Sequence, residues 1–190
     1  IVLYTGGTTG RSKGVRLTHR NVVSNGMQCG LAMDFRGDDI YLHVAPMFHS
    51  ADLLATGFTL LGGAHAFLPQ FTPTNLLRAL QDLKVSWLMI APTMIVMIIR
   101  ELRPADFDLC QLRAFLYGSA PMAPEWIRQT MDAFPGVEIA QGYGLTETSP
   151  VLTLMPFGHV RFGTVGPPRP NVELRIADDG EILARGPNVM

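Results

Sequence analysis

Short apolar stretches alternate with segments of helical periodicity along most of this chain, and this alternation constrains the fold more than any other feature. Five stretches are rich in branched and aromatic residues and are bounded by Gly or Pro, as buried parallel strands tend to be: 41–45, 65–69, 85–91, 113–118 and 137–142. Repeated strand–helix–strand units favour a mostly parallel sheet with helices on both faces. The sequence therefore predicts an α/β fold.

Between these strands, apolar residues recur at the spacing of one helix face. The stripes are Val23, Met27 and Leu31; Leu54, Phe58 and Leu61; Leu76, Leu80 and Leu83; and Ile127, Met131 and Phe134. Residues 92–102 are apolar nearly all round and begin with Pro92, so we expect a helix that is covered on all sides. Thr18 is the expected N-cap of the helix that follows a glycine-rich stretch.

The character of the sequence changes after Pro150. Two alternating stretches meet at Asp179-Gly180, a dipeptide that favours a β-hairpin. We therefore expect a small antiparallel β element near the C-terminus. The chain divides into a partial α/β nucleotide- and acyl-binding core at 1–150 and the start of a β-rich subdomain at 151–190.

Composition limits the functional classes. The 190 residues carry a formal net charge of −1 and only 16% of them are charged, so there is no electrostatic footprint for nucleic acid. No apolar run is long enough to form a transmembrane segment. Cys29 and Cys110 stand far apart in apolar surroundings, and we expect both to be buried free thiols.

The stretch "YTGGTTGRSKG" at 4–14 presents much bare backbone, with a single lysine, Lys13, near its end. Glycine lets backbone N–H groups approach anionic oxygens, threonine hydroxyls add donors, and a following helix start would add a positive end, all of which suit a polyphosphate. The Walker pattern is not matched, because Lys13 is followed by Gly14 rather than by Ser or Thr. A plain hairpin tip explains the same residues, so both interpretations stay open.

Two further turns follow predicted strands, at the edge where α/β sheets bind ligands. In "QGYGLTETSP" at 141–150, the ring of Tyr143 could stack on a flat base, and Thr146 with Glu147 offers oxygens suited to phosphate and Mg²⁺. In "YGSAP" at 117–121, small residues would admit a planar ring. A capped helix start with a solvated glutamate, and tight packing, are the plainer interpretations of these two turns.

Together, "YTGGTTGRSKG", "GYGLTE" and the closing "GEILARGPNVM" resemble the adenylate-forming superfamily over essentially all 190 residues. Within it, the chain is most similar to the acyl-CoA synthetases, or fatty-acid–CoA ligases. The resemblance implies an incomplete adenylate-forming N-terminal domain, with the C-terminal lid domain and its catalytic lysine absent from this sequence. We therefore expect the parent protein to be an acid–thiol ligase and the 190 residues alone to lack turnover.

The resemblance also implies roles for individual residues. The implied ATP- or AMP-binding residues are Thr5, Gly6, Gly7, Thr8, Thr9, Gly10, Lys13, Gly118, Ser119, Ala120, Gln141, Gly142, Tyr143, Gly144 and Thr146. The implied catalytic residues are Lys13, His49, Thr146 and Glu147. Thr5 and Glu147 would hold Mg²⁺, whereas His49, in "APMFHS", and Gly118 would border the acyl substrate. Apolar residues such as Met89 could shape an acyl tunnel or simply belong to the core.

The implied reaction is the ATP-dependent activation of a carboxylic acid, of the fatty-acid type, to an acyl-adenylate, followed by thioester formation with coenzyme A. Because both first-step reactants are anions, charge neutralisation and positioning matter more than a catalytic base. Two alternatives stay open: an acyl-AMP ligase that delivers to a carrier protein, and a non-catalytic nucleotide- or acyl-binding module. The expected setting is cytoplasmic, with membrane-peripheral attachment and a homodimer left open.

Overall fold

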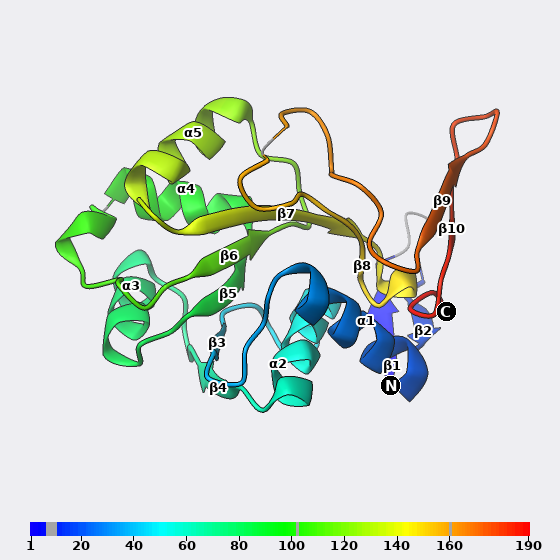
Figure 1. The fold of residues 1–190 in the computed structure, drawn as a ribbon, viewed down its shortest axis with the longest axis horizontal. Helices are drawn as coiled ribbons and strands as arrows, with labels where there is room; N and C mark the ends of the chain where they lie inside the picture. Colours follow the sequence, from blue (N-terminus) through cyan, green and yellow to red (C-terminus); the bar gives the residue numbers. More distant parts are fainter. Residues whose placement is uncertain (7–10, 102, 160) are drawn as a thin grey trace.

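The computed structural model describes residues 1–6, 11–101, 103–159 and 161–190. Its centre is a six-stranded sheet in the order β4-β3-β5-β6-β7-β8, in which β8 alone runs antiparallel to its neighbour (Figure 1). The strands are β3 (Ile40–His43), β4 (Ala64–Phe67), β5 (Trp87–Ile90), β6 (Ala114–Tyr117), β7 (Glu138–Gly144) and β8 (Val151–Leu154). The predicted α/β class is confirmed, and each of the five predicted strands is present.

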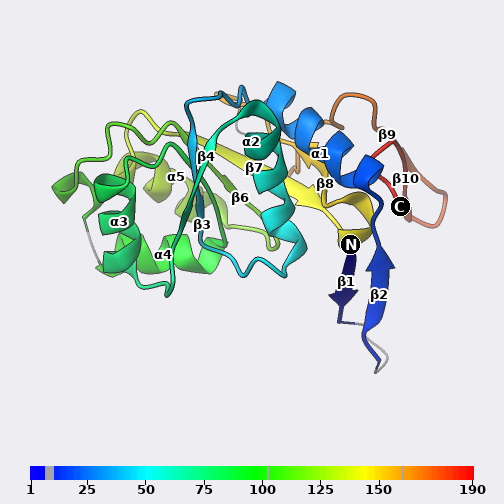
Figure 2. The ribbon, with the colours of Figure 1, turned by 90° about the horizontal axis from the view of Figure 1, so that it is seen from below.

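Helices cover both faces of the sheet. Helices α1 and α2 lie side by side on one face, and α3, α4 and α5 pack on the other (Figures 1 and 2). The α-helices are α1 (His19–Ala32), α2 (Ala55–Leu61), α3 (Pro73–Asp82), α4 (Pro92–Glu101) and α5 (Pro124–Ala133). Short 3₁₀ helices lie in the connections: η1 (Ser50–Leu54), η2 (Pro104–Asp106) and η3 (Thr146–Thr148).

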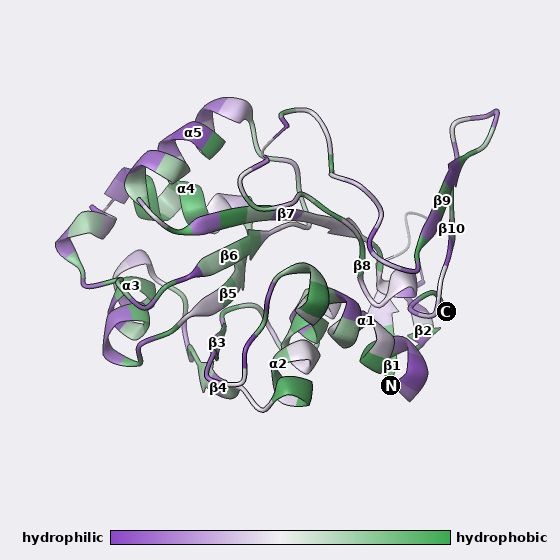
Figure 3. Ribbon diagram, viewed as in Figure 1, coloured by the Kyte–Doolittle hydropathy of each residue, from purple (hydrophilic) through white to green (hydrophobic). Residues whose placement is uncertain are grey.

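Side chains of neighbouring residues in the central strands point to opposite faces of the sheet. Leu88 and Phe115 pack against α3 to α5, whereas Trp87 and Leu116 belong to the core beneath α1 and α2. Because side chains alternate along a strand, a strand covered on both faces needs apolar residues at every position. This requirement explains the continuous apolar runs of β5 and β6. In Figure 3, β6 is coloured as hydrophobic over much of its length, whereas the exposed β9 is hydrophilic.

Local sequence sets the starts of the helices. Thr18 caps α1 as predicted: its hydroxyl accepts the Asn21 N–H at 3.1 Å, and the Asn21 side chain accepts the Thr18 N–H at 2.9 Å. Thr72 caps α3 in the same way, accepting the Asn75 N–H at 3.0 Å. Helices α3, α4 and α5 each begin with proline, whose missing N–H has no helical partner at that position.

The apolar stripe predicted for the inner face of α1 faces outward instead. Met27 is 57% exposed and Leu31 is 79% exposed, whereas the polar residues Asn21, Asn25 and Gln28 are buried. Helical spacing identifies a face of like residues, but it does not say which face meets the protein. The polar face of α1 is buried because its amides find hydrogen-bond partners there, as described below.

Three further expectations about burial are corrected. Helix α4 is not covered on all sides, since Met97 is 42% exposed. Leu61, Leu83 and Met131, members of three predicted stripes, are exposed because each lies near the C-terminal end or at the edge of its packed face. Cys29 is buried as expected, but Cys110 is exposed on the connection between α4 and β6.

Two hairpins stand apart from the main sheet. β1 (Val2–Thr5) pairs with β2 (Lys13–Arg16), and β9 (Glu173–Ile176) pairs with β10 (Ile182–Arg185). The second hairpin turns at Gly180, whose φ of +88° suits glycine, so the predicted antiparallel element is confirmed. β8 pairs within the main sheet, and the division at residue 150 stays a prediction. Within the described residues, no helix has the length and apolarity needed to cross a membrane.

Candidate functional site

A cavity of about 210 Å³ opens at the carboxyl ends of β5, β6 and β7, on the face covered by α1 and α2. Apolar side chains from the strands form one part of its wall, and polar side chains from the loops form another. Its lining consists of His49, Ser50, Ala51, Met89, Leu116, Ser119, Gly142, Tyr143, Gly144, Leu145, Thr146, Pro150 and Val151. Six of the residues predicted from the sequence, from three separate segments of the chain, thus border one cavity.

His49 reaches this cavity as the N-cap of η1. Its Nδ1 accepts the Ala51 N–H at 3.1 Å, so a neutral ring carries its proton on Nε2, where it can donate to an anionic ligand. The adjacent Ser50 accepts a hydrogen bond from the Thr146 hydroxyl at 3.1 Å. This bond joins η1 to η3 and links two predicted site residues through a serine that the sequence motifs did not identify.

Two glycines allow the strand ends around the cavity to approach closely. A Cβ on Gly144 would lie 1.6 Å from the carbonyl oxygen of Pro150, where β7 and β8 shift register. A Cβ on Gly118 would lie 2.8 Å from the carbonyl oxygen of Gly142. Backbone, rather than a mobile side chain, occupies both positions, so only glycine fits without movement. The small residues of the motifs therefore have a packing role as well as any binding role.

The glycine-rich stretch is a hairpin, with Thr5 directly opposite Lys13. Gly7, Thr8, Thr9 and Gly10 lie outside the described residues. Strand β2 lies against η3, so the hairpin and the turn that carries Thr146 and Glu147 are neighbours. Their two motifs are far apart in the sequence, because one begins at residue 4 and the other at residue 141. The helix expected after the loop is α1, which begins at His19 behind its predicted N-cap Thr18, and β2 lies between the loop and this helix.

Glu147 and Thr5, the predicted magnesium ligands, offer a carboxylate and a hydroxyl oxygen. Within the described residues, the Glu147 carboxylate has neither a hydrogen bond nor an ion pair with the protein, while its backbone carbonyl accepts the Met190 N–H at 2.8 Å. Mg²⁺ in proteins takes one or two such oxygens and completes its shell with water and substrate phosphates. The donor set therefore fits this ion.

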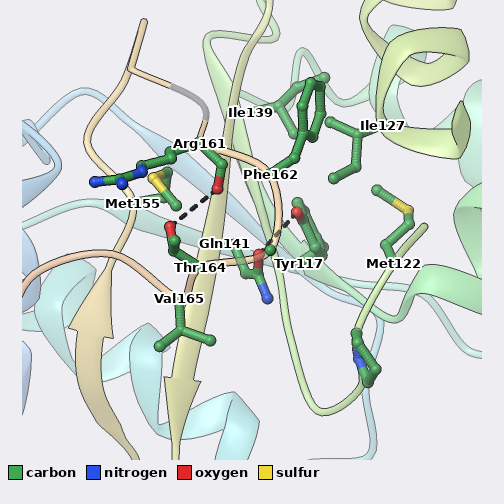
Figure 4. A pocket seen from close by; sticks show the side chains of 12 residues that line it. Tyr117, Met122, Ile127, Ile139, Gln141, Met155, Arg161, Phe162, Thr164 and Val165 are labelled. Carbon is green, nitrogen blue, oxygen red and sulfur yellow. Dashed lines mark hydrogen bonds between the residues drawn. The ribbon is translucent and has the colours of Figure 1, made fainter. Parts of the chain in front are cut away.

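A second cavity, of about 180 Å³, lies on the face covered by α4 and α5 (Figure 4). The Tyr117 hydroxyl donates to Oε1 of Gln141 at 3.1 Å, and Figure 4 shows these two side chains pointing toward each other. Burial raises the pKa of Tyr117, so its hydroxyl stays a neutral donor. Gln141 thus faces this second cavity, whereas the next residue, Gly142, lines the first.

Several residues that line the cavities were not identified from the sequence. Ser50, Leu116 and Val151 border the first cavity, and Arg161, Phe162 and Thr164 border the second. Strand alternation could have identified Leu116, because side chains two residues apart share a face of a strand. Leu116 therefore lies on the same face as Ala114 and as the predicted site residue Gly118, which follows the end of β6. The loop residues 161–164 carry no motif, and only the folded chain brings them to Gln141. Gly118 is buried, and Ala120 is exposed beside it.

Comparison with known proteins identifies the family. The model of a family described as AMP-binding enzyme matches residues 1–190. The chain is 33% identical to a probable 4-coumarate–CoA ligase from Dictyostelium discoideum and 32% identical to a long-chain-fatty-acid–CoA ligase from Bacillus subtilis, in each case over 100% of the chain and 37% of the relative. It therefore spans little more than a third of the length of these curated relatives.

A solved structure gives the same result. The o-succinylbenzoate coenzyme A synthetase from Bacillus subtilis, in complex with ATP and magnesium ion, superposes with a TM-score of 0.88 at 25% identity, covering 100% of this chain and 41% of that one. The family match over the full chain, the shared fold and the three motifs agree. The chain belongs to the AMP-binding enzyme family.

Proposed function

We propose that the protein containing this chain uses ATP to activate a carboxylic acid as an acyl-adenylate and then transfers the acyl group to coenzyme A. The observation that carries this proposal is the convergence of separate motifs: His49, Tyr143 and Thr146 border one cavity, and the glycine-rich hairpin lies against η3. The names of the curated relatives, which are CoA ligases, support the same reaction.

In the first step, a carboxylate oxygen attacks the α-phosphorus of ATP, a P–O bond forms, and pyrophosphate leaves with the electron pair of the broken bond. The His49 Nε2–H can orient the carboxylate at the mouth of the cavity. Lys13 and the Thr146 hydroxyl lie on the two neighbouring elements and can contact the phosphates. Mg²⁺, held through Glu147 and Thr5, would neutralise phosphate charge when bound. Positioning and charge stabilisation supply the catalysis, and no base is needed.

The nucleotide base fits best between the Tyr143 ring and the turn that follows β6. That turn, 118–120, begins at Gly118, where backbone approaches β7 closely, and Gln141 offers a side-chain amide on the neighbouring strand. An aromatic ring and a glycine-rich turn can enclose a planar heterocycle between them. We therefore assign Gly118, Ser119, Ala120, Gln141, Gly142 and Tyr143 to the adenine and its surroundings.

The acyl group fits the apolar wall of the first cavity. Met89, Leu116 and Val151 lie at the side of the cavity away from the loops, so the carboxyl end would meet His49 and the hydrocarbon would meet the strands. A fatty acid is the class that we propose. In the second step the thiol sulfur of coenzyme A attacks the acyl carbon, a C–S bond forms, and AMP leaves. A cytoplasmic location and a homodimer remain part of this proposal.

The test measures pyrophosphate release by the whole protein with a panel of fatty and aromatic acids, with and without coenzyme A. Glu147→Ala should lower turnover by about 100-fold or more, because it removes a charged ligand that acts on the transferring phosphoryl group. Glu138→Ala, at the exposed far end of β7, is the matched control and should retain activity. Adenylate formed without use of coenzyme A would indicate a carrier-protein ligase. Failure to release pyrophosphate with any acid would overturn the proposal in favour of a binding module.

A further inference from the structure

Four hydrogen-bonded side chains run from beneath the cavity to the protein surface. The Asp52 carboxylate accepts from Nδ1 of His43 at 2.8 Å, Nε2 of His43 lies 2.9 Å from Nδ1 of His65, and Nε2 of His65 lies 3.0 Å from the Thr59 hydroxyl. We call these four residues the relay. They come from η1, β3, β4 and α2, which are consecutive elements of the chain on one side of the sheet.

The relay is buried at one end and reaches solvent at the other. Asp52 and His43 are only 7% and 6% exposed, His65 is half-buried on the edge strand β4, and Thr59 is exposed. The Phe67 ring stacks on His43 with centroids 4.5 Å apart. A buried carboxylate needs a partner, and the hydrogen-bonded chain from that partner continues through His65 to the exposed Thr59.

The buried end of the relay holds the segment that carries the candidate site. Asp52 follows His49 by three residues, and its own N–H donates to the His49 carbonyl oxygen at 3.0 Å. The same short helix presents Ser50 to Thr146 and Ala51 to the cavity. Fixing the Asp52 side chain therefore fixes the wall of the cavity on which the His49 imidazole is mounted.

The relay has two fully hydrogen-bonded arrangements that differ by one proton. In the first, both rings are neutral: His43 donates from Nδ1 to Asp52 and accepts at Nε2 from His65, and His65 accepts the Thr59 hydroxyl proton. In the second, His43 donates from both nitrogens, His65 accepts at Nδ1 and donates from Nε2, and the Thr59 hydroxyl turns to the Ala55 carbonyl oxygen, 3.4 Å away. Only the second pairs the buried carboxylate with an imidazolium.

The neighbouring groups leave this proton on His43. Burial, and then the charge of His43, lower the pKa of His65, so His65 stays neutral in either arrangement. Tyr41, whose ring lies 5.0 Å from that of His43, has its pKa raised by burial and then by Asp52, and the thiol of Cys29 near it has a pKa raised to about 11. Helix α2 and strand β5 contribute no charged side chain.

We propose that Asp52, His43 and His65 are positioning residues, which hold the His49 wall of the acyl cavity and exchange one proton with solvent through His65. The expected effect on catalysis rests on the proposed function, whereas the hydrogen-bonded relay does not depend on it. One proton taken up at the surface reverses the hydrogen bonds of the relay and forms the ion pair under η1. The catalytic efficiency toward the acid should then depend on the protonation of the relay.

The test compares kcat/KM for the acid between pH 5.5 and 8 in the whole protein and in two variants. His65→Gln should keep the best activity within about threefold but move the relay's ionisation in the profile, because an amide replaces the imidazole that pairs with His43 Nε2. Asp52→Asn should lower kcat/KM for the acid about tenfold at every pH by loosening the His49 wall, with KM for ATP unchanged. His159→Gln and Asp38→Asn, both exposed and remote from the relay, are the matched controls.

Histidine-ring NMR of the same proteins separates this proposal from the proposed reaction. The His43 ring resonances should shift in His65→Gln and again in Asp52→Asn, because each substitution changes one of the two hydrogen-bond partners of the ring, whether or not any acid is activated. His43 ring resonances and pH–rate profiles that coincide between the wild-type protein and His65→Gln would overturn the relay. Ring resonances that shift as described in a protein without ligase activity would overturn the proposed function alone.

Discussion

The two faces of the central sheet are built on different principles. The face under α3, α4 and α5 is filled mainly by a large apolar core that includes Leu77, Leu88 and Ile98, with the second cavity at its edge. The face under α1 and α2 also has an apolar core, but buried polar side chains surround it, among them Asn25, Gln28, His43, Asp52 and Arg169. The candidate acyl cavity opens on this second face.

The difference shows how each face is stabilised. An apolar face needs only volume and shape, so many sequences satisfy it. In a buried polar face, each polar group needs a hydrogen-bond partner in one geometry. Such a face tolerates fewer substitutions, but it positions the adjoining loops more precisely. Asn21 illustrates this: its side-chain amide donates to the carbonyl oxygens of Pro187 and Val189, and so holds the end of the chain against α1. The predictions below test this contrast.

The largest effect should come from Arg169, the guanidinium at the centre of the polar face. It is 2% exposed and donates to the Asn25 and Gln28 side chains and to the Val151 carbonyl oxygen. Arg169→Ala would remove the charged donor from these buried acceptors and leave a cavity, and the weak remaining contacts from Asn188 and Cys29 would not replace it. At about 1–3 kcal/mol for each affected group, we expect a loss of about 4 kcal/mol in the free energy of unfolding. Denaturant titration of the whole protein, followed by a signal from this domain, measures it.

Arg175→Ala is the control for this prediction. Arg175 is exposed on β9, and its removal should change the unfolding free energy by less than about 0.5 kcal/mol. Arg169→Lys should recover only part of the loss, because an ammonium cannot reproduce the planar fork of donors. Equal stability of Arg169→Ala and Arg175→Ala would show that the polar face is held by its apolar core alone.

The next effect compares Leu88 and Met89, neighbours on β5 that face opposite sides. Leu88 belongs to the apolar core under α3 to α5, whereas Met89 lines the acyl cavity. Leu88→Ala should cost about 3 kcal/mol of stability through the lost burial and the cavity left behind, with KM for the acid unchanged at temperatures where the protein stays folded. Met89→Ala should instead change KM for the acid severalfold.

Thermal unfolding and steady-state kinetics on the same preparations separate the two residues. A change in KM for the acid in Leu88→Ala comparable to that in Met89→Ala would mean that the two faces are not independent. Because the side chains differ little in volume and adjoin in sequence, the strand supplies its own matched control.

A smaller effect should follow from Gly118→Ala, where the backbones of two strands meet. The added Cβ would lie 2.8 Å from the Gly142 carbonyl oxygen, and relief requires the turn after β6 to move away from β7. We expect a loss of about 2 kcal/mol, as for other overpacked positions, measured by denaturant unfolding. Gly6→Ala, where no atom of the described residues lies within 4 Å of an added Cβ, should leave stability nearly unchanged and serves as the comparison. Similar changes in stability at both positions would contradict steric crowding as the cause, because the lower entropy of the unfolded chain makes Gly→Ala stabilising where there is room.

The sequence predicted the apolar face better than the polar face. Alternating strands and helices were enough to predict the sheet and its helical layers, because burial leaves a periodic apolar pattern. The inner face of α1 was missed for the converse reason: Asn25 and Gln28 look like solvent-facing residues until Arg169, 144 and 141 positions away, supplies their partners. Short motifs identified His49 and Thr146, but not Ser50, which joins them.

The smallest effect tests the polar face through pH. Burial, followed by the charge of His43, lowers the pKa of His65 in the folded protein below its ordinary value of about 6.5. At pH values between the lowered pKa of the folded protein and the ordinary pKa of the unfolded chain, the unfolded chain therefore binds more protons than the folded one. Stability should therefore be complete above about pH 6.5 and should fall as the pH drops through the folded pKa. His65→Gln should remove this part of the pH dependence.

Melting temperatures at several pH values between 5 and 7.5, compared between the wild-type protein and His65→Gln, measure this contribution. The change should be modest because water screens a half-buried ring. His159→Gln, at an exposed position, should retain the wild-type pH dependence. If His65→Gln loses stability on acidification as steeply as the wild-type protein, the acid sensitivity arises elsewhere. A flatter dependence would instead show that burying histidines beside Asp52 makes this face sensitive to protons, a property that the apolar face cannot have.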